Sequence, residues 1–295
     1  MAMIEIRDIC KLYGFGEATT LALDEVNLSI EEGEFVAIMG PSGCGKSTLM
    51  NIIGMLDSPT SGVYNLRSRS SAKLSPNRLA KIRRDEVGFI FQFYNLLPNL
   101  TVIENVALPL FYRGVSYVRR LKAASEMLER VGLKEREYYF PRHLSGGQIQ
   151  SVAIARALIN NPRIIIADEP TGNLDSASSR VILELLSEIH KSGRTILLVT
   201  HNPEITRYAT RVVYMHDGTI IQDEQTTIGD VAPTARREMY RLTAKTEEDD
   251  LAGVSALMNL TADSETIPKP RRHPKKKVKH VHKPKKAKQR RKVKQ

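Results

Sequence analysis

The sequence lacks the features that would point to a secreted or membrane-embedded protein. Of its 295 residues only two are cysteines, Cys10 and Cys44, too few for a disulfide framework. No apolar run approaches the roughly 18 residues that a membrane-spanning helix requires. Residues 1–8 carry Glu5 and lack the pattern of a signal peptide. We therefore expect a cytosolic protein, and its 41% hydrophobic content is enough for a real core.

Acidic residues are missing from one segment, and this absence accounts for the charge of the whole chain. The chain has 44 Lys and Arg against 33 Asp and Glu, a formal net charge of +11. Residues 269–294 hold 15 of the basic residues and no acid, so the remainder carries 29 basic and 33 acidic residues, net −4. The tail from residue 268 onward is also nearly free of apolar residues, which predicts disorder. The body is therefore not a basic nucleic-acid-binding domain, although the tail is a candidate basic arm.

The stretch from Gly40 to Thr48 fits the phosphate-binding pattern G-x-x-x-x-G-K-[ST]. The apolar run 35–39 before it predicts a buried parallel strand, and residues 47–55 predict a helix. A loop between them offers free N–H groups and the positive end of a helix dipole to an anion. Lys46 would then reach the β- and γ-phosphates, and Ser47 would ligate Mg²⁺. The residues predicted to contact the nucleotide here are Gly40, Pro41, Ser42, Gly43, Cys44, Gly45, Lys46, Ser47 and Thr48.

Alternating strand and helix patterns predict an α/β sheet with a helical insertion between residues 95 and 157. Strands are expected at 4–9, 23–30, 35–39, 87–91, 164–167, 195–200, 212–215 and 219–222. Helices are expected at 47–55, 74–84, 102–112, 117–131, from about 145, and at 176–191. Residues 59–62 are expected only to break the first helix, whereas Asp217-Gly218 signals a hairpin turn.

Two acidic residues, Asp168 and Glu169, directly follow the apolar strand 164–167. A carboxylate at the end of a parallel strand would lie beside the phosphate loop, where Asp168 can hold Mg²⁺ through water. Glu169 could then polarise an attacking water. The alternative, a solvated acidic turn, would be favoured for this stretch without the phosphate loop.

The segment Leu144-Ser145-Gly146-Gly147-Gln148 has two interpretations. Ser145 and Gln148 fit an S-x-x-Q capping box at the start of a helix. Two glycines directly after the cap are poor helix formers, which indicates a close approach to another group. A second phosphate-binding helix terminus fits this pattern better.

Taken in order, the phosphate loop, residues 144–148 and Asp168-Glu169 resemble the ATPase subunit of an ABC transporter, over about residues 3–224. The resemblance implies that Gln92 senses Mg²⁺ and contacts a membrane partner. It implies further roles for three residues: Asp175 in a loop that crosses a dimer, His201 at the γ-phosphate, and Tyr13 stacked on adenine. Without the surrounding motifs, His201 and Tyr13 would be a surface imidazole and a packing aromatic.

Shorter motifs narrow the resemblance to one branch of that family. Residues 54–62, 95–98, 104–106 and 169–175 resemble the lipoprotein-release and macrolide-export ATPases, with cell-division ABC ATPases as near relatives. Ser151 stands where the family usually has arginine, Phe93 where a second glutamine is common, and residues 67–71 replace the usual Gly-Asp turn. We expect Ser151 to alter packing or rate without loss of nucleotide binding.

The resemblance implies a P-loop ATPase domain at 1–224, with an antiparallel β subdomain and a helical subdomain at about 93–158. A linker, 225–267, would contain part of a helix at 233–245, and a disordered basic tail would follow at 268–295. The implied protein hydrolyses ATP with Mg²⁺ as a homodimer bound to separate membrane subunits, at the inner face of the cell membrane. The alternative is a soluble ABC ATPase that acts on nucleic acid through its tail. The tail would bind anionic lipid or RNA, and the sequence does not predict the cargo.

Overall fold

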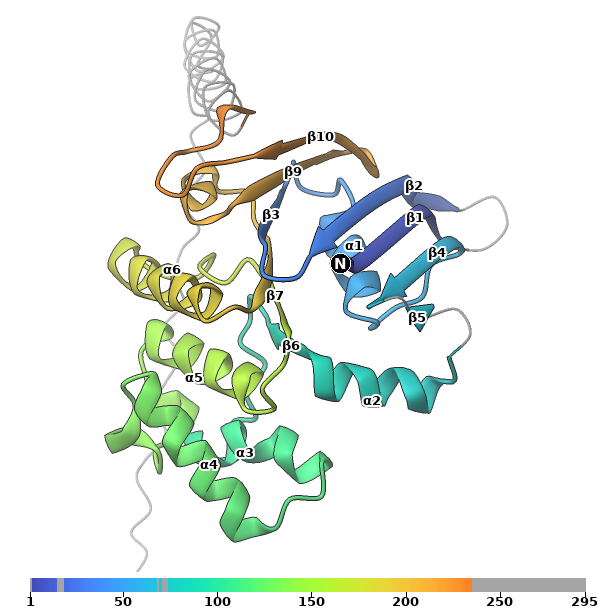
Figure 1. Ribbon diagram of the computed structural model, residues 1–295. Helices are drawn as coiled ribbons and strands as arrows, with labels where there is room; N and C mark the ends of the chain where they lie inside the picture. The colour runs from blue at the N-terminus through green and yellow to red at the C-terminus, as the bar shows by residue number, and fades with distance from the viewer. Residues whose placement is uncertain (1, 15–18, 68, 71–73, 235–295) are drawn as a thin grey trace, which may run out of the picture. The chain divides into compact units, whose positions relative to one another are not determined.

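The computed structural model describes residues 2–14, 19–67, 69–70 and 74–234 (Figure 1). Within these residues the centre of the fold is a six-stranded sheet in the order β10-β9-β3-β8-β7-β6. Its strands are β3 (Phe35–Met39), β6 (Val87–Ile90), β7 (Ile164–Asp168), β8 (Thr195–Val199), β9 (Arg211–His216) and β10 (Thr219–Gln225). All neighbours pair in parallel except β10, which pairs antiparallel with β9. Every residue of β3 and β8 is buried, which explains why these strands are continuous apolar runs.

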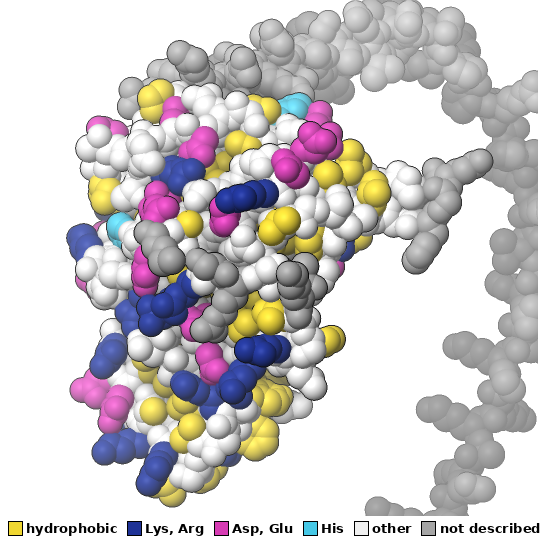
Figure 2. Space-filling view, turned by 45° about the vertical axis from the view of Figure 1, so that its right-hand side comes forward, with side chains coloured by type: hydrophobic (Ala, Val, Ile, Leu, Met, Phe, Trp, Pro, Cys, Tyr) yellow, Lys and Arg dark blue, Asp and Glu magenta, His cyan; other side chains and the backbone are white. Residues whose placement is uncertain are grey.

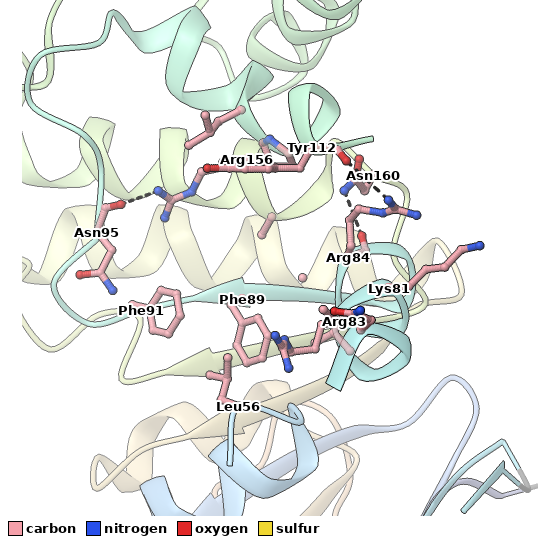
Figure 3. Close-up of a pocket in the computed structure, with 17 residues that line it drawn as sticks. Leu56, Lys81, Arg83, Arg84, Phe89, Phe91, Asn95, Tyr112, Arg156 and Asn160 are labelled. Atoms are coloured by element: carbon pink, nitrogen blue, oxygen red, sulfur yellow. Dashed lines mark hydrogen bonds between the residues drawn. The ribbon is translucent and has the colours of Figure 1, made fainter. Parts of the chain in front are cut away.

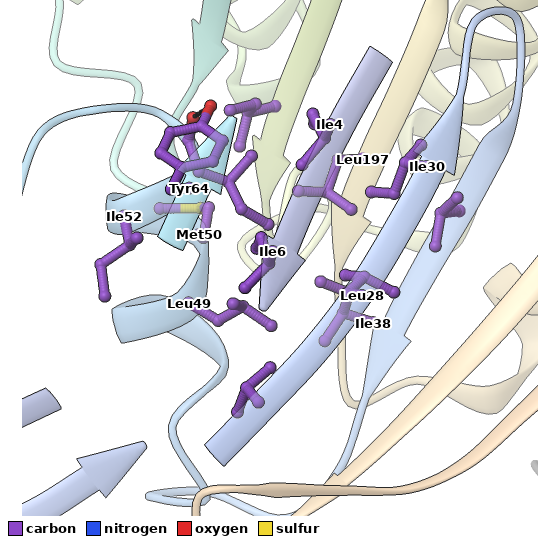
Figure 4. Close-up of a cluster of buried hydrophobic side chains, with 14 of the residues drawn as sticks. Ile4, Ile6, Leu28, Ile30, Ile38, Leu49, Met50, Ile52, Tyr64 and Leu197 are labelled. Carbon is purple, nitrogen blue, oxygen red and sulfur yellow. Dashed lines mark hydrogen bonds between the residues drawn. The ribbon is translucent and has the colours of Figure 1, made fainter. Parts of the chain in front are cut away.

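A second, antiparallel sheet of four described strands has the order β2-β1-β4-β5. These strands are β1 (Ala2–Tyr13), β2 (Thr20–Glu31), β4 (Ser61–Leu66) and β5 (Arg69–Ser70). In β2, Val26, Leu28 and Ile30 are buried while the residues between them are exposed, so one face covers the core. Figure 4 shows these side chains meeting those of Leu49 in helix α1 (Lys46–Ile53) and Leu197 in β8. The second sheet thereby fixes α1, and with it the phosphate loop, against the central sheet.

Three helices form a separate hydrophobic cluster, at the opposite end from β9 and β10 in Figure 1. They are α3 (Val102–Tyr112), α4 (Tyr117–Arg130) and α5 (Gly146–Leu158), and their cluster includes Val106, Leu128 and Val152. The other described helices are α2 (Pro76–Glu86), α6 (Ser176–Lys191) and the short 3-10 turns Lys134–Arg136, Pro141–His143 and Pro203–Tyr208. The helical insertion expected from the sequence is therefore present.

The predicted helices 102–112 and 176–191 have those bounds in the structure, and Asp217-Gly218 does connect a hairpin, in which His216 pairs with Thr219. The first helix ends at Ile53, short of the predicted Met55, because Met55 adopts a left-handed φ of 57°. The helix expected at 74–84 lies at 76–86, because Ser75 caps it and Pro76 occupies its first turn.

The interpretation of residues 59–62 as a simple break was incomplete. Residues 61–66 form β4, which pairs with β1, and the turn residues Ser61 and Gly62 belong to this strand. Gly62 has a φ of 94°, and a Cβ there would lie 2.3 Å from the Asp8 carbonyl oxygen. The glycine that suggested a loop is therefore required by the close approach of β1. Residues 67–71 are partly described, with Arg67 at φ 48° leading into β5.

Most of the predicted linker and the entire predicted tail, residues 235–295, lie outside the described residues. Of the helix predicted over 233–245, only residues 233 and 234 are described, and they are helical. The domain boundaries and the disorder of the tail stay predictions.

Candidate active site

The phosphate loop runs from the end of β3 to α1, and two of its glycines are required by close contacts. Gly40 has a φ of 148°, and a Cβ on it would lie 2.2 Å from the Met215 carbonyl oxygen. Gly45, at φ 98°, precedes α1, and a Cβ there would lie 2.5 Å from the Ala22 carbonyl oxygen. The loop is thus wedged between β2 and β9, in a conformation that presents the first N–H groups of α1.

Lys46 is buried inside this loop, with 7% of its surface exposed. Its Nζ donates hydrogen bonds to the carbonyl oxygens of Gly40, at 2.8 Å, and Pro41, at 2.7 Å. Ser47, the next residue, is exposed at the start of the helix. The ammonium group is therefore already held where phosphate oxygens could take over its hydrogen bonds, with a free hydroxyl beside it.

The two acidic residues lie at the end of β7, as the sequence predicted. Burial raises the pKa of Asp168, the charge of Glu169 raises it further, and the charge of Lys46 opposes both effects. Glu169 has a left-handed φ of 42°, and its N–H donates to the Val199 carbonyl oxygen at 2.9 Å. The structure therefore brings the acidic pair into electrostatic contact with the phosphate loop, more than 100 residues away in the sequence.

Glu169 also meets His201 and Gln92. The His201 Nδ1 atom lies 2.7 Å from Glu169 Oε1, and both residues border a cavity of about 490 Å³. A Cβ built on Gly172 would lie 3.3 Å from both Gln92 Nε2 and Glu169 Oε2. Asn173 Nδ2 donates to the Gln92 carbonyl oxygen at 3.0 Å. Three residues predicted from separate motifs therefore form one cluster.

The segment at the start of α5 forms the capping box that the sequence allowed. The Ser145 N–H donates to Gln148 Oε1 at 3.0 Å, and the Gln148 N–H donates to Ser145 Oγ at 3.4 Å. A Cβ on Gly146 would lie 3.2 Å from Leu174 Cδ2, and one on Gly147 would lie 3.0 Å from Ser178. The close approach indicated by the two glycines is therefore, within this chain, to the start of α6.

Asp175 caps α6, where its Oδ1 accepts hydrogen bonds from the N–H groups of Ala177, at 3.0 Å, and Ser178, at 2.9 Å. Ser145, Gln148 and Asp175 form a second group, joined through Gly147 and Ser178, whereas Lys46 and Glu169 belong to the first. The sequence did not separate these two groups.

Tyr13, at the end of β1, is 42% exposed and close to α1. Its Oη donates to Asp57 Oδ2 at 2.8 Å, and the Lys11 ammonium lies 4.9 Å from the ring centroid. Burial, with the hydrogen bond to Asp57 second, raises the pKa of Tyr13. Lys11 and Asp57, which also form an ion pair at 2.8 Å, were not identified from the sequence, because they are 46 residues apart.

A groove of about 790 Å³ begins beside this cluster (Figure 3). It lies between α2, β6, α3 and α5; its lining includes Leu56, Phe89, Phe91, Lys81 and Arg83. Arg156 of α5 donates to the carbonyl oxygens of Tyr94, at 2.7 Å, and Asn95, at 2.5 Å, at one end of the groove. These two acceptor residues have left-handed φ angles of 60° and 50°. Arg156 therefore holds the loop that follows Gln92 in an unusual conformation.

The residues present fit a magnesium–nucleotide complex. Within the described ranges, no three His, Cys, Asp or Glu side chains gather into a metal cluster. Mg²⁺ is commonly held by one or two carboxylates together with substrate phosphates, so a single hydroxyl and carboxylate beside a phosphate loop match its needs. In the part of the chain that is described, no helix is long and apolar enough to span a bilayer.

Comparison with known proteins agrees with this geometry. The ABC transporter family model matches residues 23–172. The ABC transporter ATP-binding protein YvrO of Bacillus subtilis is 50% identical over 230 residues, which cover 78% of this chain and 99% of YvrO. The ATP-binding protein MJ1508 of Methanocaldococcus jannaschii is 52% identical over 222 residues, or 75% of this chain and 98% of that protein. The macrolide export ATP-binding/permease protein MacB of Hyphomonas neptunium is 51% identical over 221 residues, but these cover only 34% of MacB.

A solved structure has the same fold. The dimeric ATP-binding cassette MJ0796, in a post-hydrolysis state with ADP and Pi, superimposes with a TM-score of 0.71 and 46% identity. The match covers 76% of this chain and 98% of that chain. The mixed α/β architecture predicted from the sequence is thus confirmed as the ABC ATPase fold. This chain belongs to the ABC transporter family, as one of its ATP-hydrolysing, nucleotide-binding subunits.

Proposed function

We propose that this subunit works as a homodimer that drives separate membrane subunits in an export or mechanotransmission complex. The observation that carries the proposal is the position of one loop, residues 91–95. At Gln92 it meets the Glu169 carboxylate, and at Phe91 and Asn95 it lines the apolar groove. A partner segment seated in the groove would therefore sense the state of the catalytic residues through a single short loop.

The catalytic proposal assigns one task to each residue of the first group. Lys46 binds the β- and γ-phosphates, and Ser47, Gln92 and Asp168 hold Mg²⁺, which neutralises phosphate charge when bound. Glu169 orients the attacking water and accepts its hydrogen bond. His201, which shares a hydrogen bond with Glu169, fixes this carboxylate and lies on the γ-phosphate side.

The second group is proposed to act on the nucleotide of the other protomer. Ser145, Gly146, Gly147 and Gln148 begin α5, a helix of 13 residues whose N-terminus can stabilise phosphate charge. Asp175 lies beside them and would contact the partner across the dimer. The separation of the two groups within one chain, together with the dimeric title of the related cassette, supports ATP binding between two copies.

The proposal of separate membrane subunits rests on the relatives and the groove. YvrO and MJ1508 are matched over nearly their full length, whereas the MacB proteins extend well beyond the match and are named as ATP-binding/permease proteins. An apolar groove with basic residues on its lining suits a partner helix that carries acidic residues. The protein would then be cytoplasmic and peripheral, at the inner face of the cell membrane.

A nucleic-acid-acting ATPase stays the alternative, with the segment 269–294 as its anchor. That segment carries 15 basic residues and no aromatic, so it would bind RNA through charge alone, with a steep dependence on salt. Anionic lipid is the ligand favoured for the tail if the body sits under a membrane. Co-purification with a membrane protein, in contrast to RNA or DNA, distinguishes the two functions.

Replacement of the catalytic carboxylate tests the proposal. Glu169→Gln should abolish turnover, while ATP binding persists and an ATP-bound dimer accumulates, because the amide cannot accept the proton-bearing hydrogen bond in the same way. Glu184→Gln, the same change at an exposed position of α6, is the matched control and should hydrolyse ATP normally. Near-normal hydrolysis by Glu169→Gln would refute the assigned role.

The docking loop is tested separately. Phe93 is 74% exposed directly after Gln92, whereas Leu96 packs against the helical cluster, so Phe93→Glu perturbs the surface with less effect on folding. This variant should keep its basal ATPase activity and lose stimulation by the membrane subunits. Unchanged stimulation would count against the loop as the docking face.

A further inference from the structure

The turn that joins α3 to α4 exposes an unusual set of large apolar side chains. Phe111 is 53% exposed, Tyr112 69%, Tyr117 57% and Val118 76%, all within eight consecutive residues. Exposed apolar side chains are ordinary when scattered, but a cluster of them marks an interaction surface. We call these four residues, with Arg113, Arg119 and Arg120, the α3–α4 tip.

The α3–α4 tip is also basic. Between Glu104 and Glu126 the sequence has four basic residues and no acidic one. The Arg120 guanidinium lies 5.1 Å from the centroid of the Phe111 ring and 5.0 Å from that of Tyr117. Figure 2 shows hydrophobic and basic side chains side by side on the lower part of the molecule, where Figure 1 places α3 and α4.

The acidic group that faces the tip does not cancel this charge. Asp85, at the end of α2, pairs with Arg84 at 2.8 Å and with Arg113 at 3.5 Å, so its single negative charge is shared by two guanidinium groups. Arg119, Arg120 and Lys122 have no such acidic partner among the described residues that face them. The tip therefore keeps a positive potential on a body whose charge outside the tail is net −4.

The exposed rings are not needed to hold the turn. Gly114, at φ 77°, donates its N–H to the Phe111 carbonyl oxygen at 2.9 Å, and the Val115 N–H donates to the Leu110 carbonyl oxygen at 3.0 Å. These backbone bonds close the end of α3 in the usual glycine-dependent manner. The side chains of Phe111 and Tyr117 can therefore be replaced without disturbing the backbone, and their exposure calls for another explanation.

We propose that the α3–α4 tip binds the surface of an anionic phospholipid bilayer. Tyrosine and phenylalanine rings suit the interfacial region of a bilayer, and arginines at the same depth pair with lipid phosphates. Tyr112 also lines the apolar groove, so a membrane subunit seated in that groove would bring the tip towards the same bilayer. This last step rests on the proposed function; the composition of the tip does not.

Nucleic acid fits the tip less well than lipid does. Single strands bind by stacking bases on open ring faces along an extended basic groove. Here Arg120 packs against two of the rings, and the basic residues are confined to one turn and the start of α4.

The test is co-sedimentation of the full-length protein with vesicles, either of phosphatidylcholine alone or of phosphatidylcholine and phosphatidylglycerol in equal parts. The tail is present in every sample, so differences between variants report on the tip. Phe111→Ser/Tyr117→Ser should lower the partition coefficient on the anionic vesicles by about tenfold, a loss that persists at high salt because it is apolar. Arg119→Gln/Arg120→Gln should lower it at low salt by roughly fivefold per charge. The control is Val181→Ser/Ile221→Ser, which removes apolar side chains that are 59% and 61% exposed elsewhere, and should bind like the unmodified protein.

Three results would overturn the proposal: binding by the tip variants equal to that of the control, equal binding of the unmodified protein to both vesicle types, or normal vesicle binding with loss of stimulation by the membrane subunits. The third would assign the tip to protein docking. Basal ATPase activity, measured on the same samples, should be unchanged in the tip variants. Failure of the proposed function would instead appear as hydrolysis by Glu169→Gln, whatever the vesicles show.

Discussion

Arg156 offers the sharpest test of how the groove communicates with α5. Its guanidinium, half-buried beside the groove, donates to the carbonyl oxygens of Tyr94 and Asn95. Burial lowers its pKa, which shows that the cation is held at a cost in solvation. Arg156→Met removes both hydrogen bonds while it keeps much of the side-chain volume.

The magnitude follows from these two bonds. A hydrogen bond to a charged group contributes about 1.5–3 kcal/mol, so the gross loss is about 3–6 kcal/mol. The released carbonyl groups lie at an open groove where water can reach them, and the desolvation of the cation is recovered. We therefore expect a net destabilisation of about 2–3 kcal/mol. In a domain of this size, that corresponds to a fall in Tm of between about 4 and 12 °C.

The more specific consequence concerns the loop after Gln92. Tyr94 and Asn95 occupy left-handed conformations that a side chain disfavours, so without Arg156 they should relax. Amide hydrogen exchange over residues 93–97 should rise well beyond that of β3, and stimulation by the membrane subunits should fall more than basal hydrolysis. Arg156→Lys, which retains the charge but not the forked geometry, should be intermediate. Arg180→Met, at an exposed position of α6, is the control. Exchange in 93–97 that stays at the level of the unmodified protein would refute the reasoning.

Three further outcomes are expected. Lys46→Ala should lose nucleotide affinity itself, measured by equilibrium binding, because it removes the buried cation of the phosphate loop; retained affinity would contradict its role. Asn105→Ala should destabilise the domain by about 3 kcal/mol in denaturant unfolding, since the fully buried Asn105 exchanges hydrogen bonds with both backbone groups of Leu97 and leaves them unpaired. A loss below about 1 kcal/mol would show that water replaces the amide. Deletion of residues 268–295 should leave ATP hydrolysis in solution intact and weaken sedimentation with anionic vesicles at physiological salt, because it removes 15 basic residues; impaired hydrolysis would show that the tail supports the body.

Local chemistry explains why so much of the site could be predicted. The phosphate loop, the capping box at Ser145 and the hairpin at Asp217-Gly218 each depend on a few consecutive residues whose backbone conformations are set by their own composition. Asp168 and Glu169 were predictable for a related reason, because the carboxyl ends of parallel strands lie at one edge of a sheet.

Other features depend on contacts between distant residues. The strand 61–66 was missed because Gly62 resembles a turn until β1 lies against it. The pairing of Tyr13 with Asp57, and of Arg156 with two carbonyl oxygens, joins residues 44 to 62 positions apart, and nothing in the sequence near either partner indicates the other.

The division between sequence and tertiary structure follows from the range of the forces involved. By itself, the sequence determined which segments bind phosphate, which helices form and where the charge of the tail resides, since each of these is a property of neighbouring residues. Only the tertiary structure decided that Glu169, His201 and Gln92 meet, that Ser145 and Asp175 form a separate group, and that the α3–α4 tip is exposed. These are outcomes of packing, in which the burial of β3, β8 and the helical cluster fixes the remaining side chains in space.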